Sequence, residues 1–176
     1  MRFAPTNLNG AWIVEPEPHK DNRGLFARTF CAQEFRHHGL MDAFVQCNTS
    51  WNALKGTVRG LHYQLPPSSE AKLVRCTAGA TWDVIVDLRP DSSTYLQHVG
   101  VDLTAKNRHA LYIPEMFAHG FQTLEDETEV LYQMSEFYTP ELARGLRYDD
   151  PKLGIRWPLV AASISDRDQA WDLLPT

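Results

Sequence analysis

The sequence is organised around Arg59-Gly60-Leu61-His62-Tyr63-Gln64, followed eight residues later by Lys72-Leu73-Val74-Arg75. Side chains alternate between apolar and polar from Leu61 to Leu65, and Lys72 opens a second run with strand character, so both segments are predicted to be β-strands. A period of two places His62 and Gln64 on the same face of the first strand. We therefore expect basic and polar side chains to gather on one wall of a sheet, as in a site for an anionic substrate. The alternative is an ordinary solvent-exposed face of a sheet.

The residues around these segments predict how the second strand pairs with the strands before and after it. Pro66-Pro67-Ser68-Ser69 ends the first strand, because proline lacks the N–H that a sheet needs. The second strand starts at Lys72, and we expect it to return beside the first. It then reaches Gly79-Ala80, a turn that predicts a hairpin with residues 81–88.

The strand predicted at residues 81–88 has two different faces. One face is apolar and should pack in the core; it consists of Trp82, Val84, Val86 and Leu88. The other face carries Asp83 and Asp87, which we expect to form ion pairs with Lys72 and Arg75. Such pairs usually orient neighbouring side chains, so a structural role is favoured for both aspartates.

The rest of the chain is also rich in short strands. They are predicted at residues 8–16, 25–30, 44–51, 97–103, 109–113, 118–124 and 128–137. Helices are short: one or two turns at residues 31–38, and one that begins at Ser165. Strands separated by frequent turns predict an all-β antiparallel sandwich or barrel. We find no linker or repeat, so residues 1–176 should form one domain.

Composition excludes several classes of protein. The chain has 176 residues, of which 43% are hydrophobic, and a net charge of -5. An acidic chain is not expected to bind nucleic acid or an anionic membrane surface. No apolar run is long enough to span a bilayer. Cys31, Cys47 and Cys76 show no C-x-x-C spacing and no leader precedes Pro5, so we expect a cytoplasmic protein with its cysteines in the core.

Two isolated residues allow both a structural and a functional interpretation. His119 lies between aromatic residues and next to Gly120, where it could be either a residue of the functional site or a buried structural histidine. Tyr132 lies in the middle of the strand at 128–137, where most tyrosines only pack and form a hydrogen bond.

The sequence resembles one known family over nearly its whole length. The matching segments are Asp21-Asn22-Arg23-Gly24-Leu25-Phe26, Gln46-Cys47-Asn48, Arg59-Gly60-Leu61-His62-Tyr63-Gln64, Lys72-Leu73-Val74, Asp83-Val84-Ile85-Val86-Asp87, Ala118-His119-Gly120-Phe121 and Gly154-Ile155-Arg156-Trp157-Pro158. They are similar to those of dTDP-4-dehydrorhamnose 3,5-epimerases. The resemblance implies a cupin-type jelly roll, a homodimer, and a nucleotide-linked 4-keto-6-deoxy sugar as substrate, with no cofactor.

The same resemblance implies roles for five residues at the reacting centre. His62 corresponds to the general base, and Asp168 to the carboxylate that orients it, with Asp166 as a second candidate. Lys72 corresponds to the cation that stabilises the enolate, and His119 to a polar partner there. Tyr132 matches the acid that returns the proton from the opposite face of the sugar ring.

The resemblance also implies a binding site for the nucleotide. Arg23 and Arg59 match positions that hold the diphosphate, for which a guanidinium is well suited. The walls around the nucleoside correspond to Phe26, Gln46, Asn48 and Tyr138. Three positions depart from the family pattern: Arg28 and Ala143 stand where glutamate is usual, and Arg167 stands where lysine is usual. The base and sugar that this chain selects therefore stay open.

Two other classes of function are compatible with a jelly-roll fold. Jelly rolls also host metal-dependent enzymes, and His62, Gln64 and His119 could form part of a metal shell. Against this, no histidine follows two residues after His62, and Lys72 in the same cavity would repel a cation. A non-catalytic sugar-binding module is the other alternative.

Overall fold

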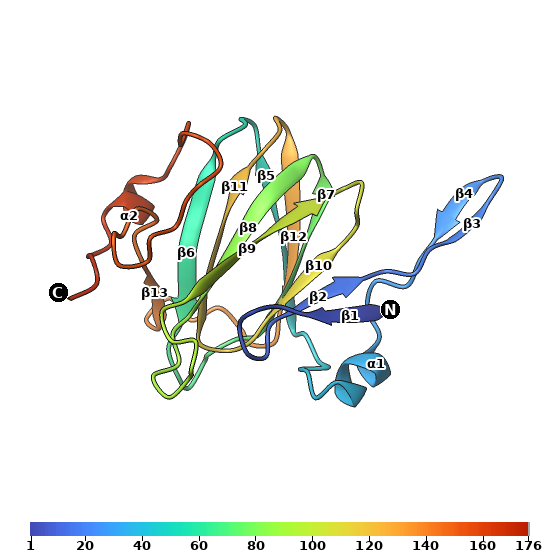
Figure 1. Ribbon diagram of the computed structural model, residues 1–176, viewed down its shortest axis with the longest axis horizontal. Helices are drawn as coiled ribbons and strands as arrows, with labels where there is room; N and C mark the ends of the chain where they lie inside the picture. Colours follow the sequence, from blue (N-terminus) through green and yellow to red (C-terminus); the bar gives the residue numbers. More distant parts are fainter. Residues whose placement is uncertain (176) are drawn as a thin grey trace.

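Antiparallel strands build most of the molecule, which is described here from a computed structural model covering residues 1–175. The strands form two large sheets that face each other (Figure 1). This arrangement confirms the all-β antiparallel sandwich predicted from the alternating sequence pattern.

Every pairing inside the two large sheets is antiparallel. The six-stranded sheet has the order β1 (Arg2–Pro5), β2 (Trp12–Glu15), β10 (Ala110–Ile113), β7 (Lys72–Ala78), β12 (Thr128–Met134) and β5 (Gln46–Asn52). The five-stranded sheet has the order β13 (Ala143–Gly145), β6 (Val58–Gln64), β11 (Phe117–Thr123), β8 (Ala80–Asp87) and β9 (His98–Thr104).

Strand β7 does not pair with either of its neighbours in sequence, so both pairings predicted for it are wrong. It lies between β10 and β12 in the six-stranded sheet, whereas β6 and β8 belong to the other sheet. The reason is that β7 is apolar on both faces: Val74 packs in the central core and Leu73 packs in a second cluster. Such a strand is stable in the middle of a sheet with both faces covered.

The central core lies between the sheets and takes side chains from both of them. Val74, Leu111 and Val130 come from the six-stranded sheet, and Ile85 and Phe121 come from the five-stranded one. Burying these side chains is the main force that holds the layers together, at roughly 1.5–3 kcal/mol for each large apolar residue.

Two smaller clusters cover the outer faces of the sheets. The short helix α1 (Ala32–His37) places Phe35, which is fully buried, against the six-stranded sheet. On the five-stranded sheet, Val84 and Val86 are buried with Trp82 and Leu88 packed against them, which confirms the apolar face predicted for residues 81–88.

A two-stranded hairpin, β3 (His19–Asp21) and β4 (Gly24–Phe26), projects from the body of the molecule (Figure 1). All of its residues are exposed. The strand predicted at residues 25–30 was too long, because β4 ends at Phe26. Arg28 therefore lies outside the strand.

The C-terminal helix α2 (Asp166–Gln169) begins as predicted, because the Ser165 side chain accepts a hydrogen bond from the backbone N–H of Asp168 at 3.1 Å. Of the three cysteines, Cys76 is buried, Cys31 is half-buried and Cys47 is exposed, so the expected core location is right only for Cys76. Among residues 1–175, no helix has both the length and the apolar character that crossing a membrane requires.

Candidate active site

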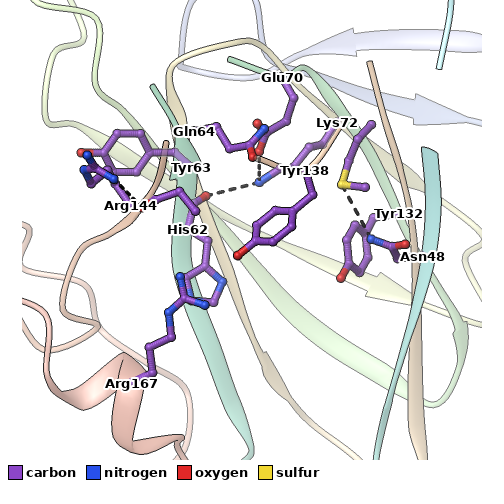
Figure 2. A pocket seen from close by; sticks show the side chains of 12 residues that line it. Asn48, His62, Tyr63, Gln64, Glu70, Lys72, Tyr132, Tyr138, Arg144 and Arg167 are labelled. Carbon is purple, nitrogen blue, oxygen red and sulfur yellow. Dashed lines mark hydrogen bonds and ion pairs between the residues drawn. The ribbon is translucent and has the colours of Figure 1, made fainter. Parts of the chain in front are cut away.

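A cavity lies between the two sheets and consists of two adjoining hollows of about 150 and 290 Å³. Both hollows are lined by His62, Lys72, Tyr132 and Arg167, so they form one continuous site. His62 belongs to β6 in one sheet, and Lys72 and Tyr132 belong to β7 and β12 in the other (Figure 2). The polar side chains expected on one wall of a sheet therefore face each other from two walls.

His62 and Asp168 form a short polar contact, with 2.6 Å between His62 Nε2 and Asp168 Oδ1. The Asp168 carboxylate also accepts the backbone N–H of Gly60 at 3.3 Å. Asp168 is 4% exposed, whereas the side chain of His62 is 45% exposed toward the cavity. Of the two aspartates considered for this contact, the structure therefore selects Asp168 over Asp166.

The environment of Asp168 favours its charged form. Burial alone raises the pKa of a carboxyl group, but the hydrogen bond from His62, the charge of His62 and the N–H of Gly60 outweigh it. The pKa of Asp168 is lowered below its ordinary value as a result. A charged Asp168 fixes the His62 ring and supports the imidazolium that forms when the ring takes up a proton.

His119 is the neighbour of His62 on the adjacent strand β11, where the two residues are register partners. Its Nε2 lies 2.9 Å from Asp83 Oδ1, and both side chains are buried. The backbones of β6 and β11 approach closely here, since a Cβ on Gly60 would lie 2.5 Å from the Cα of Gly120. This close approach brings the two histidines to the same wall of the cavity.

Lys72 is buried at the start of β7, where its ammonium group contacts Glu70 Oε1 at 3.0 Å and the carbonyl oxygen of His62 at 3.3 Å. The expected ion pairs of Lys72 and Arg75 with Asp83 and Asp87 are therefore wrong. Asp83 contacts His119, and Arg75 donates to the carbonyl oxygen of Thr29.

Asp87 has a separate structural role at the end of β8. It accepts hydrogen bonds from Arg89 at 2.7 and 2.9 Å, from Ser92 at 2.6 Å and from Thr94 at 2.7 Å. Burial raises the pKa of this carboxyl, but these donors lower it far more strongly, and the net shift is downward. The structural interpretation of Asp87 is confirmed, since all these donors lie outside the cavity linings.

Tyr132 lies in β12, directly opposite Asn48 of β5. Tyr132, Asn48 and Tyr138 all line the smaller hollow. Gln46 does not line it, but Gln46 Oε1 accepts the backbone N–H of Tyr138 at 3.1 Å and so fixes the loop that carries this tyrosine. Asn48, Tyr132 and Tyr138 form the wall that faces His62 (Figure 2).

The two arginines expected at the diphosphate lie in different places. Arg59 lines the larger hollow, where its Nε donates to Asn52 Oδ1 at 2.6 Å. Arg23 lies on the projecting hairpin, where it pairs with Asp21 and its side chain is 86% exposed. Phe26 is 74% exposed on the same hairpin, so neither Arg23 nor Phe26 reaches the cavity of its own chain.

The three departures from the family pattern lie in different surroundings. Arg28 is exposed and pairs with Glu34 at 3.1 Å, away from the cavity. Ala143 and Arg167 do line the cavity. The Arg167 guanidinium carbon lies 5.5 Å from the centre of the Trp171 ring, a cation–π contact that holds its side chain on α2.

Sequence reasoning missed Glu70, a buried carboxylate in the wall of the cavity. A signal was available, because Glu70 precedes Lys72 by two residues, the spacing of side chains on one strand face. In the described part of the chain, no group of three or more His, Cys, Asp or Glu side chains is placed to hold a metal ion.

Comparison with known proteins gives a consistent result. Residues 5–175 match the family model described as dTDP-4-dehydrorhamnose 3,5-epimerase. The chain is 46% identical to the protein of that name from Methanothermobacter thermautotrophicus over 174 residues, covering 97% of this chain and 93% of the relative.

Solved structures of the same kind superpose closely. The epimerase from Bacillus anthracis, with TDP and PPi bound, gives a TM-score of 0.95 at 39% identity and covers 98% of this chain and 99% of its own. The enzyme from Legionella pneumophila, in complex with dTDP-4-keto-L-rhamnose, gives 0.92 at 38% identity, covering 98% and 92%. These likenesses confirm the predicted cupin-type jelly roll.

Proposed function

The chain belongs to the dTDP-4-dehydrorhamnose 3,5-epimerase family, and we propose that it inverts carbon atoms next to the ketone of a dTDP-4-keto-6-deoxy sugar. The observation that carries this proposal is the dyad of His62 and Asp168, which faces Tyr132 across one cavity. A base and an acid on opposite sides of a substrate are what inversion by proton transfer needs.

The reaction begins with His62 as the base. The imidazole takes the proton from a carbon next to the ketone, and the electron pair of that C–H bond forms a C=C bond. The ketone oxygen thereby becomes an enolate oxygen. Asp168 supports this step, because its charge stabilises the imidazolium and its contact at 2.6 Å holds Nε2, which leaves Nδ1 for the substrate.

Lys72 and His119 stabilise the enolate. The Lys72 ammonium is a buried positive charge, and a charge shielded from solvent acts more strongly than one in water. His119, held by Asp83, offers its other ring nitrogen to the same oxygen. These two side chains supply the charge stabilisation that a metal ion gives in other enzymes.

Tyr132 completes the inversion. Its hydroxyl gives a proton to the carbon from the face opposite to His62: the C=C electron pair forms the new C–H bond, and a lone pair of the enolate oxygen restores the C=O bond. The phenolate then regains a proton from solvent, and the His62 imidazolium releases its proton to solvent. Because Tyr132 and His62 belong to opposite sheets, a flat enolate between them presents one face to each residue.

The nucleotide occupies the rest of the cavity. Arg59 and Arg167 provide positive charge for the diphosphate. Tyr138, supported by Gln46, and Asn48 form the wall for the nucleoside. Arg28, paired with Glu34, takes no part in selecting the base within its own chain.

A second copy of the chain completes the site in a homodimer. The hairpin β3–β4 carries Arg23 and Phe26 away from its own body, and a two-stranded hairpin is marginal when it packs against nothing. An exposed arginine and phenylalanine fit the open end of a partner's cavity, where they would meet the diphosphate and the nucleoside.

The test is to incubate the purified protein with dTDP-4-keto-6-deoxyglucose and to follow the sugar by NMR. The expected result is a product inverted at one or both carbons next to the ketone, formed equally well in the presence of a strong chelator. Bound but unchanged sugar would point to a binding module, and loss of turnover that zinc or manganese restores would point to a metal-dependent enzyme.

A further inference from the structure

Glu70 and Lys72 form a buried ion pair in the wall of the cavity. Glu70 Oε1 and Lys72 Nζ lie 3.0 Å apart, and the two side chains are only 6% and 9% exposed. Removing two charges from water costs several kcal/mol for each ion, and such pairs are often no more stable than apolar residues of the same size. Stability alone therefore does not account for this pair.

The hydrogen bonds of Lys72 leave one donor free. A lysine ammonium carries three N–H donors. One of them meets Glu70 Oε1 and a second meets the carbonyl oxygen of His62 at 3.3 Å. The third has no acceptor among residues 1–175, and Lys72 lines both hollows. Figure 2 shows the Lys72 ammonium group between Glu70 and the backbone of His62, so the third donor is available to the cavity that Lys72 lines.

The backbone next to Glu70 is held in place, which gives the carboxylate that contacts Lys72 a fixed attachment. The next residue, Ala71, is fixed from both sides, because its N–H donates to Ser135 Oγ at 2.8 Å and its carbonyl accepts the Ser135 N–H at 3.0 Å. Within residues 1–175, Lys72 is the one polar partner of the Glu70 side chain, and Glu70 Oε2 is buried without any. The Glu70 carboxylate thus serves Lys72 alone.

We propose that Glu70 is a positioning residue, which together with the His62 carbonyl aims the free N–H of Lys72 at the ketone oxygen of the substrate. This inference rests on the proposed function and adds a residue to it. A lysine has a flexible four-carbon stem with many rotamers, so it needs such an anchor. A displacement of about 1 Å at a reacting centre can cost about 100-fold in rate.

The experiment compares kcat and KM for Glu70→Gln, Glu70→Leu, Lys72→Met and the double variant Glu70→Leu/Lys72→Met. Glu70→Leu removes the anchor, so kcat should fall about 10- to 100-fold with KM within about threefold of wild type. Glu70→Gln keeps an acceptor oxygen and should stay within about threefold of wild type. Glu115→Gln is the control, because Glu115 is an exposed glutamate that accepts a hydrogen bond from Ser69, the residue before Glu70.

The double variant shows whether Glu70 acts through Lys72. Once Lys72 is gone, loss of Glu70 should cost nothing more, so the double variant should match Lys72→Met within about threefold. The double variant leaves neither a buried carboxylate nor a buried ammonium group without its partner, so it is expected to fold even where a single variant does not. A multiplicative loss in the double variant, or full kcat in Glu70→Leu, would overturn the inference.

Crystal structures of two variants test the inference without any activity. In Glu70→Gln, Lys72 Nζ should stay within hydrogen-bond distance of the His62 carbonyl, and in Glu70→Leu it should leave that position. An unmoved Nζ in Glu70→Leu would contradict the anchor role. If the wild-type protein fails to epimerise any keto sugar, the proposed function is wrong, and these structures still decide the role of Glu70.

Discussion

His62 Nε2 lies 2.6 Å from Asp168 Oδ1, although the two residues are 106 positions apart in the chain. His62 comes from the middle of β6, whereas Asp168 comes from a helix of four residues near the C-terminus. The contact therefore joins the C-terminal segment to the centre of the sandwich, and the candidate base depends on both.

The first prediction concerns Asp168. Asp168→Asn should lower kcat by about 100-fold or more, because an uncharged amide no longer stabilises the imidazolium of His62. Asp166→Asn is the matched control, since Asp166 is exposed on the same helix, and it should leave kcat unchanged. Steady-state kinetics measures both. Equal losses of kcat in the two variants would show that the reaction depends on the helix as a whole and not on the Asp168 carboxylate.

The lowered pKa of Asp168 also predicts how stability depends on pH. A carboxyl with a lower pKa in the folded state stabilises the protein fully above its unfolded pKa, near 3.8, and loses this effect as the pH falls through the folded value. Urea unfolding should therefore show a larger difference in the free energy of unfolding between wild type and Asp168→Asn at about pH 6 than at about pH 3. A difference in the free energy of unfolding that is the same at both pH values would contradict the lowered pKa of Asp168.

Tyr132→Phe separates the two proton transfers. Removal of the hydroxyl leaves His62 and Lys72 in place, so hydrogen exchange at the sugar should continue while inverted product falls by about 100-fold. NMR of the same sample reports both quantities. If inversion continues at the wild-type rate, Tyr132 only packs in the sheet.

Hybrid dimers test whether the hairpin serves the other subunit. Arg23→Ala and His62→Asn should each be nearly inactive alone. Co-expressed with different tags and purified as the hybrid, they should regain about half the wild-type rate, because one of the two sites then combines an intact His62 with the other chain's intact Arg23. No recovery would mean that Arg23 serves its own chain.

The alternating pattern predicted the strands well but their partners badly. Strands β5, β6, β8, β11 and β12 all lie close to their predicted positions, because a period of two is a local property of the sequence. The neighbours of β7 could not be predicted in the same way. They are β10 and β12, strands distant in sequence, and turns alone suggested the nearer ones.

The candidate site was predictable in part. Period two placed Asn48 and His62 on the faces that line the cavity, and the helix predicted to begin at Ser165 is the one that carries Asp168. Arg23 and Phe26 lie on a hairpin that projects away from the cavity of its own chain, and the local sequence pattern does not reveal this placement. Glu70 was missed because a glutamate near a turn usually indicates a solvated position.

Deuterium exchange tests the central claim most directly. Wild type and His62→Asn are incubated in deuterium oxide with dTDP-4-keto-6-deoxyglucose, and the label is followed at both carbons next to the ketone. We predict that wild type introduces deuterium at one or both carbons and that His62→Asn, in which a planar amide replaces the base, introduces none above background. Label entering the sugar at the wild-type rate in His62→Asn would contradict the account.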